Sequence, residues 1–186
     1  MTLSGGSWET AYPVTNAASD VLARVARSTD LNTSSLQIDG TFSEGRIAQV
    51  FGIALPNAST DAQVRLQTFD SGGGTVHDSG WLDVFPEVFD QDALLWEANN
   101  FWSRKYLSRT TKNTTFVRPY DTSATAKVTD FQINLADSTN PDGFLDVAYI
   151  TLAERWQFGI NPAYVLHLRQ PARTRSVPAR GGAKSF

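Results

Sequence analysis

The sequence predicts an all-β fold, and three observations lead to this expectation. Short runs that alternate apolar and polar residues recur along the chain, separated by Gly, Asn, Asp, Ser and Pro. Signals for helices are nearly absent. The 186 residues include 11 Phe, 5 Trp and 5 Tyr, and aromatic residues favour strands. A chain of this length can form one domain with its own core, of the sandwich or barrel type.

The predicted strands are spaced as in sandwiches and barrels. Those of the first half lie at 21–28, 35–42, 46–55 and 62–69. The strand at 46–55 is mostly apolar, which indicates that both of its faces are covered. The Gly-rich run 71–74 turns the chain into a return strand at 81–85. The second half adds strands at 114–120, 126–137 and 145–154.

The segment 87–108 interrupts this pattern, and the sequence favours a long aromatic excursion here over a short helical turn near 92–97. Its aromatic residues, with one more just before it, are the candidate binding or interface residues: Trp81, Trp96, Phe101, Trp102 and Tyr106. They could pack in the core, form a subunit interface or stack on sugar rings. A basic cluster beside them, Arg104, Lys105 and Arg109, is expected at a solvated edge or against an acidic neighbour.

The stretch Asn140-Pro141-Asp142-Gly143 raises a choice between a turn and a calcium site. Pro presets φ at the second turn position, Gly tolerates positive φ at the fourth, and Asn bonds its own backbone at the first. Calcium held by Asp137, Asn140 and Asp142 is the alternative, but calcium needs six to eight oxygen ligands. The sequence therefore favours a turn between two strands.

Charge and composition divide the chain into an N-terminal arm at 1–20, a sandwich domain at 21–168 and a basic tail at 169–186. The tail has five basic residues and no acid: Arg169, Arg173, Arg175, Arg180 and Lys184. Because the tail has no periodic apolar residues that could pack in a core, we expect it to become ordered only when it binds a partner. Its charges are too sparse to favour nucleic acid. We expect it to mediate assembly by lying along an acidic neighbour made of the same protein.

Other features limit the function classes. The chain has no Cys, and neither a signal peptide nor a membrane span is visible, so we expect synthesis in a cytoplasm without export by the usual route. His77, expected in a solvated turn, and His167 lack a visible catalytic partner. Asp90, Asp92 and Glu97 could form a glycosidase pair only if their spacing in space allows it. The sequence predicts a non-enzymatic protein without metal or cofactor.

Three stretches resemble structural proteins of tailed-phage virions: "HDSGWLDVFPEVFD" (77–90), "LLWEANNFWSRKY" (94–106) and "NPDGFLDVAYITLAERWQFGIN" (140–161). The resemblance spans roughly 20–182, but Pro56-Asn57 stands where the family usually has His-Asn. It implies a galactose-binding-like jelly-roll β-sandwich, related to discoidin modules. To this sandwich the composition adds the extended N- and C-terminal arms.

The same resemblance implies a structural protein of the tail tip or baseplate, made in the host bacterium and assembled with other virion proteins and with its own copies in a symmetric ring. Two alternatives stay open. One is a carbohydrate-binding module that attaches to host-surface glycans. The other is a cell-wall hydrolase.

Overall fold

The computed structural model describes residues 1–90, 96–97, 99–105, 115–120 and 126–155. The elements in these residues are β1 (Thr2–Ser4), the 3-10 helix η1 (Val14–Ala18), β2 (Ala26–Arg27), β3 (Gln37–Arg46), β4 (Val50–Ala54), β5 (Gln63–Phe69), β6 (Thr75–Asp78), β7 (Leu82–Asp83), β8 (Thr115–Pro119), β9 (Val128–Ala136), β10 (Asp146–Val147) and β11 (Tyr149–Ala153).

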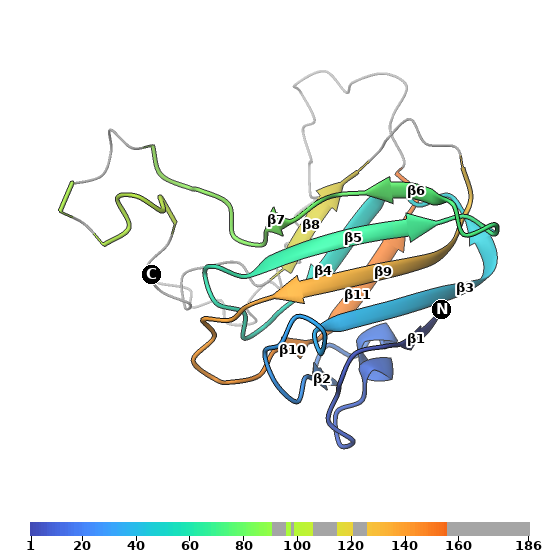
Figure 1. Ribbon diagram of the computed structural model, residues 1–186, viewed down its shortest axis with the longest axis horizontal. Helices are drawn as coiled ribbons and strands as arrows, with labels where there is room; N and C mark the ends of the chain where they lie inside the picture. The colour runs from blue at the N-terminus through green and yellow to red at the C-terminus, as the bar shows by residue number, and fades with distance from the viewer. Residues whose placement is uncertain (91–95, 98, 106–114, 121–125, 156–186) are drawn as a thin grey trace, which may run out of the picture. The chain divides into compact units, whose positions relative to one another are not determined.

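The strands form two principal antiparallel sheets. The larger has the order β1-β3-β9-β5-β6, with β7 also paired to β5, and the smaller has the order β11-β4-β8. The short strands β10 and β2 pair separately. Figure 1 shows the larger sheet in front of the smaller one, and one apolar core contains side chains from both. The predicted all-β sandwich is therefore confirmed.

Period-two alternation builds this core. In β5 every second residue is buried, and in β9 the inward residues Phe131, Ile133 and Leu135 are at most 2% exposed. Full burial of each such side chain stabilises the fold by about 1.5–3 kcal/mol. Gly40 on β3 leaves room for the ring of Phe131, because a Cβ at Gly40 would lie 2.0 Å from Cζ of that ring.

Several predicted strands differ in extent from those observed. Within 21–28 the strand is limited to Ala26 and Arg27, which pair with Val147 and Asp146, and Ser28 forms an isolated bridge with Trp8. Leu22 is 61% exposed. The alternation at 21–25 therefore does not reflect a strand with a buried face. The apolar run 46–55 is divided between the end of β3 at Arg46 and β4.

The first 20 residues, predicted as an arm, pack on the domain itself. The strand β1 extends the larger sheet by pairing with β3, and Figure 1 shows the two strands side by side. Leu3, Val14 and Ala17 are buried in the core. Burial of these apolar side chains and the β1–β3 hydrogen bonds hold the segment.

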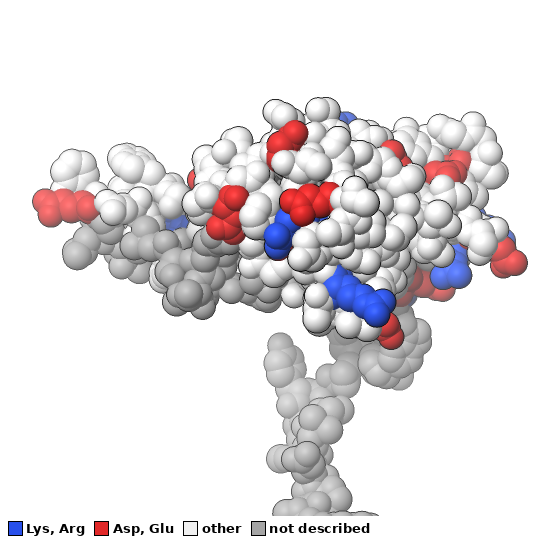
Figure 2. All heavy atoms as spheres, turned by 90° about the horizontal axis from the view of Figure 1, so that it is seen from below, with Lys and Arg blue, Asp and Glu red and all other residues white. Residues whose placement is uncertain are grey.

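Charges of both signs are scattered over the surface. On the face shown in Figure 2, Lys and Arg side chains lie singly among Asp and Glu, with uncharged surface between them. In the part of the chain that the structure describes, no helix is long and apolar enough to cross a membrane.

Candidate functional site

A groove of about 260 Å³ opens between strands β6 and β8, which are edge strands of the two facing sheets. We call it the edge groove. Apolar side chains from both sheets line part of it, including Phe51, Leu66 and Leu82. Polar side chains line the rest, including His77, Arg118 and Tyr120. Concave sites with an apolar lining and a few convergent polar groups are typical of small-ligand binding.

Strand register places these polar side chains along the groove, with His77 and Tyr120 half-buried and Arg118 exposed. On β8, Phe116 is buried in the core, so Arg118, two residues on, occupies the same face of the strand. On β6, His77 pairs with Thr68 of β5, whose side chain is completely buried. At this edge the inner face of the sandwich is therefore polar, whereas β9 and the centre of β5 present apolar residues.

His77 and Tyr120 meet across the groove. Their ring centroids lie 4.6 Å apart, with 33° between the planes. The hydroxyl of Tyr120 is buried and has no hydrogen-bond partner among the described residues. Burial raises the pKa of Tyr120, so its hydroxyl stays neutral and can both donate and accept a hydrogen bond. A buried hydroxyl without a partner costs about 1–3 kcal/mol, which marks it as a candidate ligand contact.

Asp78 also lines the groove, but its carboxylate is already bonded. Arg65 donates two hydrogen bonds to it, Nε to Oδ1 at 2.9 Å and Nη2 to Oδ2 at 2.5 Å. Gln67 and the backbone N–H of Gly80 donate two more, at 3.1 and 3.0 Å. The hydrogen bonds from Arg65, and next the one from Gly80, hold the pKa of Asp78 well below its usual range. Asp78 therefore serves to fix β6 on β5.

Sequence reasoning missed this groove. His77 was expected in a solvated turn, but the structure places it in β6, half-buried and facing inward. A signal was present in "TTFVRPY", where alternation puts Phe116, Arg118 and Tyr120 on one face. His167 lies outside the described residues.

The three Trp residues among the predicted aromatic residues lie away from the core. Trp81, Trp96 and Trp102 are 42%, 73% and 78% exposed, so the alternative of core packing is wrong for them. Phe101 is half-buried and contacts Trp102 edge-on, with centroids 5.1 Å apart. Trp81 lies in sequence between Ser79 and Leu82, which line the edge groove. Tyr106 lies outside the described residues.

The basic residues beside these aromatics hold the segment in place. Arg104 pairs with Glu87, and Lys105 Nζ lies 2.9 Å from Asp83 Oδ2 and donates to the carbonyl of Thr60 at 3.3 Å. The predicted solvated edge is therefore wrong for Lys105, whose side chain is 12% exposed, whereas Arg104 and Glu87 form a partly solvated pair. Arg109 lies outside the described residues.

The structure gives no geometry for the predicted glycosidase pair or for the predicted assembly residues of the tail. Asp90 and Glu97 are exposed, and their proposed partner Asp92 lies outside the described residues. The tail residues predicted to mediate assembly also lie outside the described residues: Arg169, Arg173, Arg175, Arg180 and Lys184.

The Asn140–Gly143 stretch forms the predicted turn. Asn140 accepts a hydrogen bond from the Gly143 N–H, and Gly143 has a φ of 76°, which Gly adopts without strain. The Asp142 N–H donates to the Asn140 side chain at 3.1 Å. Asp137 accepts hydrogen bonds from Ser59 and from the Asn140 side-chain amide. The side-chain oxygens of Asp137 and Asn140, which were considered as calcium ligands, therefore already accept hydrogen bonds from the protein.

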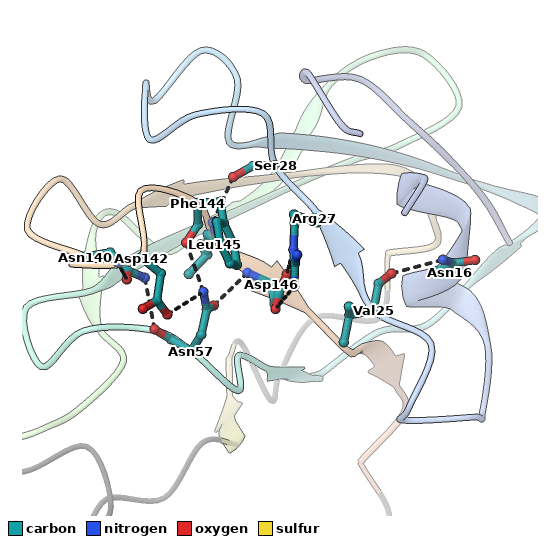
Figure 3. A network of polar contacts seen from close by, with 10 residues as sticks. All are labelled: Asn16, Val25, Arg27, Ser28, Asn57, Asn140, Asp142, Phe144, Leu145 and Asp146. Atoms are coloured by element: carbon teal, nitrogen blue, oxygen red, sulfur yellow. Dashed lines mark hydrogen bonds and ion pairs between the residues drawn. The ribbon is translucent and has the colours of Figure 1, made fainter. Parts of the chain in front are cut away.

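Asn57 ties this turn to the strands around it (Figure 3). Its Nδ2 donates to the carbonyl of Phe144 at 2.9 Å, and its Oδ1 accepts from the Asp146 N–H at 2.7 Å. Asp146 in turn accepts two hydrogen bonds from Arg27. Asn57 therefore has a structural role here. Among the described residues no group of three or more His, Cys, Asp or Glu side chains could hold a metal ion.

The sequence matches no protein-family model and no curated protein. The structure is similar to CpGH89CBM32-4 of Clostridium perfringens, solved with GlcNAc-α-1,4-galactose, at a TM-score of 0.51 and 9% identity over 82% of this chain and 89% of that one. It is also similar to GH31 CBM32-2 bound to GalNAc (TM-score 0.53, 13% identity, 83% and 97% covered).

A third similar structure is the family 32 carbohydrate-binding module from C. perfringens NanJ, solved with galactose (TM-score 0.50, 12% identity, 81% and 91% covered). At these identities the similarity shows the fold alone. The chain has the galactose-binding-like, discoidin-like jelly roll, as the sequence resemblance implied.

Proposed function

We propose that this chain is a non-catalytic module that binds a carbohydrate in the edge groove. The observation that carries the proposal is the set of polar side chains at the open edge of the sandwich: His77, Arg118 and Tyr120, which line the groove, and the buried Thr68 that pairs with His77. The buried hydroxyls of Thr68 and Tyr120, which have no described partner, cost stability, and proteins tolerate such conflicts chiefly at functional sites.

A sugar suits the chemistry of this groove. Sugar rings combine hydroxyl groups with apolar C–H faces, and the groove combines hydrogen-bonding groups with aromatic and aliphatic walls. The hydroxyl of Tyr120 can donate to or accept from a sugar hydroxyl. Three proteins of the same fold were solved with bound sugars, which supports the ligand class without locating the site in this chain.

A glycan array probed with the full-length protein tests the proposal. Wild type should bind at least one glycan, and Tyr120→Phe, which keeps the ring and removes only the hydroxyl, should weaken binding about tenfold. Trp102→Ala, on the exposed segment, should bind as wild type does. If Trp102→Ala loses binding while Tyr120→Phe retains it, the exposed aromatic residues are the site instead. If wild type binds no glycan, the carbohydrate-binding function is wrong.

The second candidate is a structural role in a phage tail tip or baseplate, located in the virion. Two observations favour it: the sequence resemblance at 77–90, 94–106 and 140–161, and the exposure of Trp96 and Trp102. Exposed Trp side chains are frequent anchors of protein interfaces. In this role they would contact neighbouring virion proteins or further copies in a ring, and the basic tail at 169–186 would lie on a neighbour.

Light scattering after size exclusion tests this second role in full-length protein, in Trp96→Ala/Trp102→Ala and after deletion of 171–186. Loss of a defined oligomer on either change, with thermal unfolding unchanged, supports it. A monomeric wild type at high concentration, together with the absence of the protein from purified particles, refutes it.

A further inference from the structure

The edge groove holds a positive charge that nothing described balances. Arg118 lines the groove, and no described residue forms an ion pair or a side-chain hydrogen bond with its guanidinium. It lies on the same face of β8 as the core residue Phe116, but at the open end of the groove, where its side chain is exposed. An arginine at such a position presents five N–H donors and a permanent charge to whatever enters the groove.

The nearby acid does not offset this charge. Asp78 accepts four hydrogen bonds, from Arg65, Gln67 and Gly80, as described above. The side chains of Arg65 and Asp78 are about equally exposed, at 34% and 33%, and their charges compensate each other. Because Arg65 already pairs with Asp78, the positive charge of Arg118 is left without a described counter-charge in the groove.

We propose that the groove selects an acidic saccharide, whose carboxylate is bound by Arg118 while the sugar ring lies toward His77 and Tyr120. This inference rests on the proposed function. Arginine and carboxylate form paired, charge-assisted hydrogen bonds that are about twice as strong as neutral ones. A neutral sugar in the same place would leave the arginine with uncharged acceptors only.

A different role for Arg118 is a guard against aggregation. Inward-pointing charges on edge strands prevent two sheet edges from pairing, and β8 is the edge of its sheet. In that case Arg118→Gln would promote self-association and leave ligand binding unchanged. The two roles therefore predict different outcomes for one variant.

The test is a calorimetric titration of the full-length protein with galacturonic acid, galactose and acetate, at low and at high NaCl. We expect galacturonic acid to bind about tenfold or more tightly than galactose, with an affinity that falls as salt rises, and acetate to bind weakly. Arg118→Gln should remove the preference for the acid but keep galactose binding. Arg24→Gln, which removes an exposed arginine away from the groove, should behave as wild type.

Each contrary result has a distinct meaning. Equal affinities for the two sugars without salt dependence overturn the acidic-saccharide inference and leave the proposed function standing. Acetate binding as tightly as galacturonic acid would show a small-anion site and also overturn it. Failure of both sugars to bind, with an array that is likewise empty, removes the proposed function itself. Because the salt dependence is measured on wild type, the test holds even if Arg118→Gln does not fold.

Discussion

The guanidinium of Arg27 on β2 binds the carboxylate of Asp146 on β10 through two hydrogen bonds, of 2.8 and 3.1 Å. The same guanidinium lies 4.0 Å from the ring centroid of Phe144 and 4.8 Å from that of Tyr12. One arginine therefore joins the N-terminal segment, strand β2 and the turn before β10. Figure 3 shows its hydrogen bonds to Asp146.

Replacing this arginine by lysine should destabilise the protein although the charge is kept. Lysine cannot form the two parallel hydrogen bonds or stack a planar group between two rings. We expect Arg27→Lys to lower the free energy of unfolding by about 1–2 kcal/mol in urea denaturation. Arg24→Lys, at an exposed position, should have little effect. Equal stability of Arg27→Lys and wild type would show that the pair contributes no more than a simple charge.

A methyl group at Gly40 should disrupt the core. The added Cβ would overlap the ring of Phe131, and overpacking costs about 1–3 kcal/mol. Gly40→Ala should therefore lower the melting temperature, although Gly→Ala at an unstrained position usually stabilises. The double variant Gly40→Ala/Phe131→Leu should recover part of the loss relative to the sum of the two single changes. A neutral Gly40→Ala would contradict the packing of Phe131 over this residue.

Asn57 should be required for the turn that precedes β10. Truncation to Ala leaves the Phe144 carbonyl and the Asp146 N–H without their partner, which costs about 2–4 kcal/mol. Asn99→Ala, at an exposed position, is the control. Hydrogen exchange should show the Asp146 amide losing protection in Asn57→Ala. Retained protection at that amide would show that Asn57 is not its essential partner.

The Arg65–Asp78 pair should make stability depend on acid pH. The pKa of Asp78 is lowered in the folded state from its usual 3.8, so its stabilising contribution is complete above that value. The contribution is lost as pH falls through the lower, folded-state pKa. Urea unfolding of wild type and Asp78→Asn should therefore differ more at about pH 7 than at about pH 3. A difference that grows on acidification would reverse the sign and refute the assignment.

Removing the Tyr120 hydroxyl should not lower the stability of the unliganded protein. This group has no hydrogen-bond partner among the described residues, so Tyr120→Phe relieves a desolvation cost. We expect the free energy of unfolding to stay the same or to rise by up to about 1 kcal/mol. Thermal unfolding of both proteins without ligand provides the measurement. A loss of stability would mean that the hydroxyl has a structural partner, and the groove would lose its strongest polar contact.

Sequence reasoning succeeded where the determining interactions are local. The alternation of 62–69 predicts strand β5, and Asn140–Gly143 predicts a turn without a ligand. The run 71–74 correctly predicts a chain reversal, but the strand that returns directly is β6 at Thr75–Asp78, and the predicted strand at 81–85 is reduced to β7. Each follows from side-chain period or backbone preference within a few residues. Where the alternation lacked a burying partner, as at 21–25, the predicted strand was wrong.

By itself, the sequence determined the class of fold and the faces of its main strands, because period and turn chemistry act over short distances. Only the tertiary structure decided that His77 and Tyr120 lie ring against ring and that Arg118 enters the same groove. These residues come from edge strands of two different sheets, and no local preference specifies which strands become edges or which sheets face each other. Long-range pairing of β5 with β9 and of β4 with β8, together with burial of the shared core, makes that choice.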